Sequence, residues 1–258
     1  MGIHFHDEQN KTSYVGREAD ISWLETIKGL VDPTDKTVLD LGCGGGIYSK
    51  AWAALGAKQV IGMDFSSVML EAAVENCRGV DNIQFHQGDA TATQWPEQSV
   101  DILFARALIH HLPDTRLFFA EAYRVLKPGG VMIVQDRTHA DVDIPGSAEH
   151  IRGYFFALFP RLLDVEMQRR PEGGLIMTQS KEAGFDRLRQ LTVWETRKTY
   201  DSAADLAAEL KNRKGRSILH ELDDDEVDRL ARHVQSKLPA QGTITEKDRW
   251  TIWYGERL

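Results

Sequence analysis

Cysteine is scarce in this sequence, and the scarcity limits what the chain can be. Cys43 and Cys77 are the only thiols among 258 residues, too few for a disulfide framework. Disulfides persist in oxidising compartments, so a chain without them is expected to work in a reducing one. Cys43 also lacks neighbouring metal ligands, and His4 and His6 are isolated, so we predict no metal site. The expected location is the cytoplasm.

Long hydrophobic runs are absent as well. No apolar stretch approaches the roughly 20 residues that a helix needs to cross a bilayer. The opening segment, MGIHFHDEQN, lacks the basic and then apolar pattern of a secretory signal. With 42% hydrophobic and 27% charged residues, the composition is that of an ordinary soluble globular protein. We therefore expect no insertion into a membrane.

The chain also lacks an excess of basic residues. It carries 31 Lys and Arg against 39 Asp and Glu, a net charge of −8. Proteins that follow a phosphate backbone usually present a basic face, because counterion release supplies much of their affinity. The densest basic run, KNRKGR at 211–216, reads as cations at the end of a helix before a stop at Gly215. Nucleic acid is not an expected partner.

Short β-branched runs alternate with helical patterns between residues 37 and 136. Strands that alternate with helices imply right-handed crossovers, and therefore a parallel sheet covered on both faces. This part of the sequence predicts a doubly wound α/β fold. The expected strands are 37–41, 59–63, 82–86, 100–104 and 131–136, and the helices between them lie within 47–55, 66–77 and 114–126.

The flanking segments add an N-terminal helix and a longer C-terminal part. The complete prediction is a mostly parallel, seven-stranded sheet in a single domain, 1–258, with helical insertions after the fifth and sixth strands. Residues 1–35 form a helical cap, 36–140 a ligand-binding core, and 141–258 a C-terminal part with substrate-cap insertions at 141–172 and 202–238. The additional expected elements are helices at 17–31, 175–185, 202–214 and 223–237 and strands at 187–200 and 244–257.

A cluster of glycines follows the first predicted strand, in VLDLGCGGG at 38–46. Glycine lets a backbone approach a ligand closely, and ligands of open α/β sheets bind beyond the carboxyl ends of the strands. A dinucleotide-binding GxGxxG fingerprint counted from Gly42 would need a third glycine where Ile47 stands. The pattern present is DxGxGxG, formed by Asp40, Gly42, Gly44 and Gly46.

This pattern resembles motif I of the class I S-adenosylmethionine-dependent methyltransferases, and other segments match that family in the same order. Asp64 ends the second strand, where an acid accepts hydrogen bonds from ribose hydroxyls, although nicotinamide enzymes place one there too. The segment QGDA resembles the adenine site, with Asp89 binding the exocyclic amino group and the Ala90 N–H reaching the ring. Phe65 and Met69 are then expected to flank the adenine.

Two later segments, ARALIHHLPD at 105–114 and RVLKPGG at 124–130, resemble the small-molecule branch of the family, which includes ubiquinone and menaquinone methyltransferases and cyclopropane fatty acid synthases. The resemblance implies a methyltransferase that binds S-adenosyl-L-methionine, methylates a small molecule by in-line displacement and releases S-adenosyl-L-homocysteine. In the cyclopropane synthase branch a histidine matching His111 lines the substrate site, so His111 is the catalytic candidate. Arg106 is expected to contribute its backbone, and Tyr14 and Arg17 to cap the cofactor carboxylate. The implied cofactor-binding residues are Tyr14, Asp40, Gly42, Cys43, Gly44, Asp64, Phe65, Met69, Asp89, Ala90 and Arg106.

Each of these assignments has a structural alternative. The glycines could form a tight turn with close helix packing, Asp64 could be a helix N-cap, and Asp89 could be an ordinary loop acid. His111 could pack at a helix boundary. The aromatic side chains at helical spacing could cover a cleft or fill a core; they are Tyr154, Phe155, Phe156 and Phe159.

Two other functions stay open at this stage. A protein that binds S-adenosylmethionine without catalysis would carry the same motifs, because methyl transfer requires no fixed catalytic residue. A Rossmann-type, NAD-dependent oxidoreductase would need the missing third glycine. The acceptor and the oligomeric state do not follow from the sequence.

Overall fold

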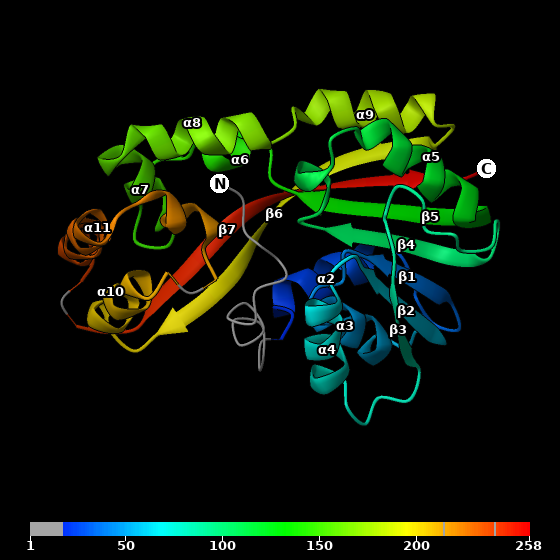
Figure 1. Ribbon diagram of the computed structural model, residues 1–258, viewed down its shortest axis with the longest axis horizontal. Helices are drawn as coiled ribbons and strands as arrows, with labels where there is room; N and C mark the ends of the chain where they lie inside the picture. Colours follow the sequence, from blue (N-terminus) through cyan, green and yellow to red (C-terminus); the bar gives the residue numbers. More distant parts are fainter. Residues whose placement is uncertain (1–17, 214, 240) are drawn as a thin grey trace. The chain divides into compact units, whose positions relative to one another are not determined.

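Seven strands form a single mixed sheet in the computed structural model, which describes residues 18–213, 215–239 and 241–258. The strand order is β3-β2-β1-β4-β5-β7-β6 (Figure 1). The first five strands pair in parallel, and β7 runs antiparallel to β5. The predicted seven-stranded, mostly parallel sheet is confirmed. The strands are β1 (Thr37–Leu41), β2 (Gln59–Asp64), β3 (Ile83–Gln87), β4 (Val100–Arg106), β5 (Leu126–Asp136), β6 (Asp186–Tyr200) and β7 (Ile244–Glu256).

The direction of winding reverses between β1 and β4, and this reversal positions the site. From β1 the chain proceeds outward through β2 and β3, whereas β4 returns to the other side of β1 and leads to β5. Leu41 at the end of β1 pairs with Met63 on one side and Ala105 on the other. The crossovers therefore diverge at these strand ends and leave a crevice for a ligand.

The chain divides into two compact units. The sheet unit contains the described residues 18–136, 172–193 and 251–258, and the helical unit contains those within 137–171 and 194–250. The sequence predicts that these two units belong to one domain, and this stays a prediction. Helices of the sheet unit are α2 (Ile21–Leu30), α3 (Ile47–Ala54), α4 (Ser67–Asn76), α5 (Thr115–Val125) and α9 (Gly173–Glu182), with a short 3₁₀ turn, η1 (Ile109–His111).

Alternating side chains of the strands build an apolar core on each face of the sheet. On β4, Leu103 faces the helices α5 and α9, and its cluster includes the buried Phe118 of α5. The next residue, Phe104, points to the opposite face and meets Trp23 of α2 and Trp52 of α3, each at a ring-centroid distance of 5.5 Å. Figure 1 shows these two pairs of helices on opposite sides of the sheet. Strands buried on both faces explain the continuous apolar runs of the sequence.

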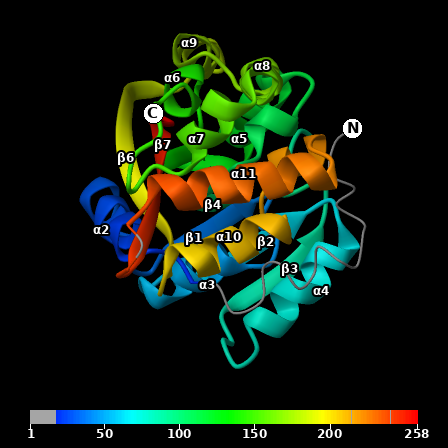
Figure 2. The same cartoon turned by 90° about the vertical axis from the view of Figure 1, so that its left-hand side faces the viewer.

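The helical unit has an apolar core of its own. Helices α10 and α11 lie side by side in it (Figure 2). Phe155, Phe156 and Phe159 are buried within this core, so the aromatic stretch packs the interior of the unit. Within the described ranges, no helix is long and apolar enough to span a bilayer. The elements of this unit are α6 (His139–Val142), α7 (Arg152–Leu158), α8 (Pro160–Arg169), α10 (Ala203–Lys211), η2 (Ser217–Glu221) and α11 (Asp224–Lys237).

Strand β5 begins earlier than predicted. Its expected start was residue 131, with RVLKPGG as the end of a helix, but α5 ends at Val125 and β5 begins at Leu126. Leu126 pairs with Val100, and the next regular pair is Val131 with Ile102, so β5 bulges in between. Pro128 lacks an N–H to donate to the ladder, and a proline of this kind is tolerated at such a bulge.

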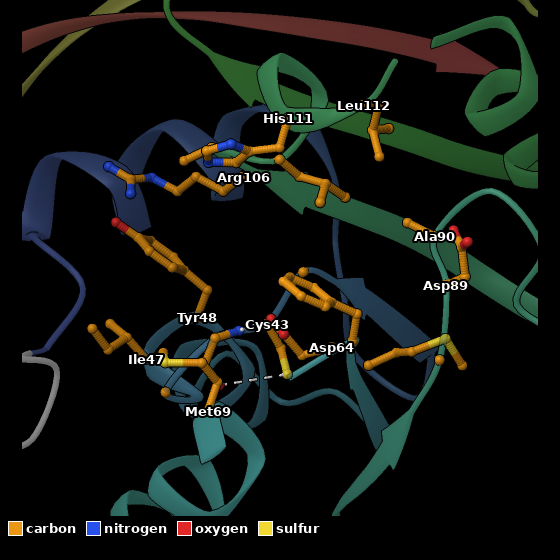
Figure 3. Close-up of a pocket in the computed structure, with 18 of the residues that line it drawn as sticks. Cys43, Ile47, Tyr48, Asp64, Met69, Asp89, Ala90, Arg106, His111 and Leu112 are labelled. Carbon is orange, nitrogen blue, oxygen red and sulfur yellow. Dashed lines mark hydrogen bonds between the residues drawn. The ribbon is translucent and has the colours of Figure 1, made fainter. Parts of the chain in front are cut away.

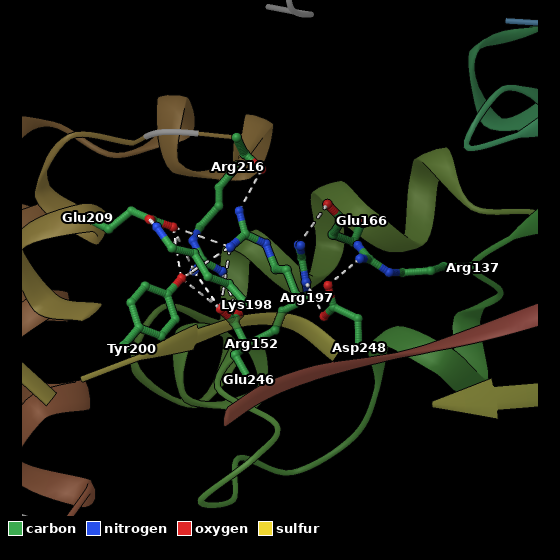
Figure 4. Close-up of polar contacts among 11 residues, drawn as sticks. Arg137, Arg152, Glu166, Arg197, Lys198, Tyr200, Glu209, Arg216, Glu246 and Asp248 are labelled. Atoms are coloured by element: carbon green, nitrogen blue, oxygen red, sulfur yellow. Dashed lines mark hydrogen bonds and ion pairs between the residues drawn. The ribbon is translucent and has the colours of Figure 1, made fainter. Parts of the chain in front are cut away.

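Buried ion pairs fill a layer of the helical unit (Figure 4). Glu246 and Asp248 stand two residues apart on β7, so their side chains share one face of the strand. Asp248 pairs with Arg137, and Glu246 pairs with Arg216. Arg216 belongs to the basic run that we expected to be cations at the end of a helix, but its guanidinium is buried against Glu246.

Candidate functional site

A pocket of about 590 Å³ lies in the sheet unit, at the carboxyl ends of β1, β2 and β4 (Figure 3). This volume is in the range of small-molecule and cofactor sites. Asp40 is not among the lining residues, and Tyr14 and Arg17 lie outside the residues that the structure describes. The predicted residues that the pocket brings together are Gly42, Cys43, Gly44, Asp64, Phe65, Met69, Asp89, Ala90, Arg106 and His111.

The glycine loop needs its glycines for backbone geometry and for packing. Gly42 and Gly46 have φ of 69° and 77°, in the left-handed region that side chains disfavour. A Cβ at Gly42 would lie 2.9 Å from Leu108 Cδ1. Burial raises the pKa of the Cys43 thiol well above its ordinary value, so this thiol stays protonated and unreactive. The glycines therefore do form a tight turn, which was the structural alternative. The same turn also forms one wall of the pocket.

Asp64 ties the glycine loop to the start of α4. Its Oδ2 accepts the Gly44 N–H at 2.9 Å, and its Oδ1 accepts the Ser66 N–H at 2.9 Å. The N-cap of α4 is Ser66, whose hydroxyl accepts the N–H of Met69, so the proposal that Asp64 caps the helix is wrong. The carboxylate of Asp64 is held by backbone donors at the edge of the pocket, and a carboxylate can accept several hydrogen bonds at once, including those of a ligand hydroxyl.

Asp40 lies beneath the loop and supports α3. Its Oδ2 accepts a hydrogen bond from the Ser49 hydroxyl at 2.6 Å, and both side chains are buried. Burial is the main cause that raises the pKa of the Asp40 carboxyl to about 7. The hydrogen bond from Ser49 opposes this rise, and the negative charge of Asp64 adds to it. Asp40 therefore holds a proton over part of the neutral pH range.

The opposite side of the pocket is a loop that follows β3. Asp89 accepts hydrogen bonds from the N–H and hydroxyl of Thr91, at 2.8 and 2.7 Å. Farther along the loop, the Thr93 N–H donates to Glu121 of α5 at 2.9 Å, which fastens the loop to the sheet unit. In Figure 3, Asp89 and Ala90 lie across the pocket from Tyr48 and Arg106. The loop thus presents one carboxylate to the pocket from a fixed backbone.

The chain leaves β4 through an unusual backbone conformation. Ala107 has a φ of 53°, although it is not glycine, and its N–H donates to the carbonyl of Gln135 at 2.9 Å. Strained residues of this kind concentrate at functional sites. The turn lets His111 line the pocket, whereas the Arg106 guanidinium stacks 4.5 Å from the centre of the Tyr48 ring. Figure 3 shows His111 and Arg106 on the same side of the pocket.

A histidine and aspartate pair beside His111 was missed by the sequence reasoning. His110 Nδ1 lies 2.8 and 3.0 Å from the two carboxylate oxygens of Asp136, which ends β5. The His110 ring in turn lies on that of His111, with centroids 3.9 Å apart. The acidic residue closing VMIVQD was the available signal, because β4 and β5 are parallel neighbours whose carboxyl ends meet.

The residues present fit a nucleoside ligand. Asp64 and Asp89 supply hydrogen-bond acceptors from two strand ends, and Phe65, about half exposed, offers an aromatic face together with the Met69 side chain. A metal site is not visible: among the residues that could be placed, no three His, Cys, Asp or Glu side chains gather as ligands. The pocket can therefore bind and orient an adenosine-bearing molecule through acceptors, backbone and apolar contacts.

Comparisons with known proteins converge on this part of the chain. Residues 39–134 match a family model described as a methyltransferase domain. The chain is 31% identical over 150 residues to demethylmenaquinone methyltransferase of Lactococcus lactis, which covers 57% of this chain and 59% of the relative. It spans less than two thirds of the length of the curated relatives that head the comparison.

Two solved structures are similar in fold over most of the chain. A protein from an antibiotic biosynthesis pathway of Anabaena variabilis, solved as a candidate methyltransferase, superimposes with a TM-score of 0.72 at 18% identity, over 93% of this chain and 98% of that one. Phosphoethanolamine N-methyltransferase 2 of Haemonchus contortus, bound to phosphomonomethylethanolamine and S-adenosylhomocysteine, gives a TM-score of 0.61 at 20% identity, over 99% of this chain and 60% of that one. At these identities the likeness shows the fold.

Proposed function

Because the chain belongs to the class I S-adenosylmethionine-dependent methyltransferases, we propose that it transfers a methyl group from this cofactor to a small-molecule acceptor. The pocket at the point of strand reversal carries the proposal. It is lined by glycines of the DxGxGxG loop and by two carboxylates, Asp64 at the end of β2 and Asp89 just after β3. The two buried, free thiols support a reducing, cytoplasmic location.

The residues of the pocket are assigned to the cofactor as follows. Asp64 holds the ribose hydroxyls, and Asp89 with the Ala90 N–H holds the adenine, while Phe65 and Met69 flank the adenine ring. When bound, S-adenosylmethionine supplies an electrophilic methyl group on a sulfonium centre. On the opposite side of the pocket, the backbone of Arg106 is proposed to contact the amino-acid part of the cofactor, and the space beside His111 is left for the acceptor (Figure 3).

His111 is the proposed acid or base. It lines the pocket beyond the end of β4, and an imidazole can accept a proton near neutral pH from an oxygen, nitrogen or carbon acid. A general base contributes roughly 10²- to 10⁴-fold, or about 3 to 5 kcal/mol, whereas alignment of bound reactants contributes about 7 to 11 kcal/mol. Most of the proposed rate enhancement therefore comes from the walls of the pocket that hold the reactants in line and exclude water.

Binding of S-adenosylhomocysteine, measured by titration calorimetry, tests the cofactor assignment. We expect Asp64→Ala to weaken binding by more than about 1 kcal/mol, the scale of a hydrogen bond to a charged group. Asp81→Ala removes an exposed carboxylate outside the pocket and is the matched control. Binding of NADH in preference to S-adenosylhomocysteine, or an unchanged affinity of Asp64→Ala, would contradict the assignment.

Turnover tests the catalytic part of the proposal. Release of S-adenosylhomocysteine is measured on a panel of phenols, amines and carboxylic acids, with wild-type protein and His111→Ala. We expect turnover with at least one class of acceptor, and a fall of at least tenfold in His111→Ala without loss of cofactor affinity. Tight binding of the cofactor with no turnover on any acceptor would favour a non-catalytic binding protein.

A further inference from the structure

We propose that His110 and Asp136 are positioning residues that hold the ring of His111 at the pocket. The inference rests on the proposed function, because it assigns to this pair the orientation of the side chain that handles the acceptor's proton. Neither His110 nor Asp136 lines the pocket, so both act through His111.

Asp136 fixes His110 at two points. One is the ring, whose Nδ1 lies 2.8 Å from Oδ2 and 3.0 Å from Oδ1. The other is the main chain, because the His110 N–H donates to Oδ2 at a longer 3.4 Å. The Asp136 carboxylate is completely buried at the end of β5, and the His110 side chain is 8% exposed. A carboxylate held rigidly by the sheet therefore anchors the turn that follows β4.

The turn needs such an anchor because it has few hydrogen bonds of its own. It is a 3₁₀ segment of three residues, Ile109–His111, in which the His111 N–H donates to the carbonyl of Leu108 at 2.9 Å and the Leu112 N–H donates to that of Ile109 at 3.2 Å. It also follows the left-handed residue Ala107, whose conformation is unfavourable without support from its surroundings. The contacts of His110 with Asp136 supply part of that support from a neighbouring strand.

The ring of His110 carries this constraint to His111. The two ring centroids are 3.9 Å apart, with the planes inclined by 44°. A carboxylate can only accept hydrogen bonds, so the proton shared with Asp136 must be on His110 Nδ1, and the ring cannot flip without losing it. One face of His111 therefore rests on a ring of fixed orientation, while its side chain lines the pocket.

Packing alone would not require a charged group here. Apolar side chains of similar volume often stabilise a buried position as well as an ion pair does, because a buried carboxylate must be desolvated. Asp136 and His110 also differ from the buried ion pairs of the helical unit, because they adjoin a side chain of the pocket. Orientation of His111 accounts for both observations.

The experiment combines kinetics with nitrogen-15 NMR of labelled histidine. Asp136→Asn keeps the shape but removes the obligatory acceptor, and His110→Phe keeps a ring beside His111 but removes the hydrogen bond. Asp101→Asn, at the other end of β4, replaces a carboxylate that pairs with Lys127 and is the matched control. For the first two variants we expect kcat to fall at least tenfold with cofactor affinity within twofold of wild type, and no such fall in the control.

The NMR measurement is independent of any acceptor and of the stability of the variants. We expect His110 of the wild-type protein to carry its proton on Nδ1; a bare Nδ1 would overturn the proposal. Full kcat in Asp136→Asn and His110→Phe would overturn it too, while leaving the methyltransferase activity intact. Failure of the wild-type protein to bind S-adenosylhomocysteine would instead contradict the proposed function.

Discussion

Arg216 and Glu246 form a two-pronged ion pair in the interior of the helical unit (Figure 4). Arg216 Nη1 donates to Oε1 at 2.6 Å, and Nη2 donates to Oε2 at 2.7 Å. The exposed fractions of the two side chains are 0% and 1%. A buried pair of this geometry is expensive to break, because the remaining charge would be left in a medium that cannot solvate it.

Arg216→Met should therefore lower the free energy of unfolding by about 3 to 5 kcal/mol, measured by urea denaturation. Arg161→Met is the control, because Arg161 is half exposed where it pairs with Glu226, and such pairs contribute about 1 kcal/mol or less. Replacing both Arg216 and Glu246 by Met should recover much of the loss. A loss below about 1 kcal/mol in the single variant would contradict the prediction.

Arg152→Met should behave differently, although Arg152 is nearly as buried. In the part of the chain that the structure describes, its guanidinium has one hydrogen bond, from Nε to Asp248 at 3.4 Å, and a long ion pair with Glu166 at 4.0 Å. Glu166 keeps its shorter pair with Arg170, at 2.8 Å, when Arg152 is removed. Asp248 keeps its shorter bond with Arg137, at 2.5 Å, when Arg152 is removed. We expect urea denaturation to detect a change of no more than about 1 kcal/mol. A loss as large as that of Arg216→Met would show that Arg152 is better paired than its contacts indicate.

Asp40 should make stability depend on pH near neutrality. Its pKa rises from 3.8 to about 7 on folding, so the native state binds this proton more tightly than the unfolded chain. The resulting stabilisation is fully present below about pH 4 and is lost as the pH rises through 7. At 1.36 kcal/mol per unit the whole change is about 4 kcal/mol.

Urea denaturation of wild-type protein and Asp40→Asn between pH 5 and 8 measures this contribution. Asparagine cannot ionise, so the stability of the wild type relative to Asp40→Asn should fall with rising pH and level off above about pH 8. A difference that stays constant over this range would mean that Asp40 does not titrate there.

Gly42→Ala should destabilise the protein, because of the backbone conformation at this position and because of a steric contact. The backbone is left-handed at this position, with φ of 69°, and a Cβ would lie 2.9 Å from Leu108 Cδ1. We expect a loss of at least about 1 kcal/mol, measured by thermal denaturation. Gly29→Ala is the control within helix α2, where a Cβ meets no atom within 4 Å, and it should stabilise by roughly 0.5 to 1 kcal/mol. Equal effects of the two substitutions would contradict the argument.

The regular part of the fold was predictable because local patterns specify it. β1 occupies the expected residues 37–41, and the helices of the core end within a few residues of their predicted limits. The pocket was predictable for a similar reason, since Asp64 ends one strand, Asp89 follows the next, and parallel strands end at the same edge of a sheet. Position along an element was enough to bring these side chains together.

Which side chains pair between distant parts of the chain could not be predicted in this way, although the position of Asp136 at the end of a strand placed it near the pocket. His110 and Asp136 are 26 residues apart, and Arg216 and Glu246 are 30 apart. Each of these residues, taken alone, is an ordinary charged or polar residue at the end of an element or in a basic run. Their pairing depends on strand order and on how helices return to the strands, which the local pattern of residues does not encode.

The two compact units are interleaved along the chain, and this restricts how the protein can be divided. The described part of the helical unit comes from residues within 137–171 and 194–250, separated by a stretch of the sheet unit. Phe155 of the first stretch is buried in one cluster with Leu206 and Leu230 of the second. A fragment truncated at residue 193 would therefore expose the apolar side of α7 to water. Chimeras that graft this unit onto a relative must carry both stretches together.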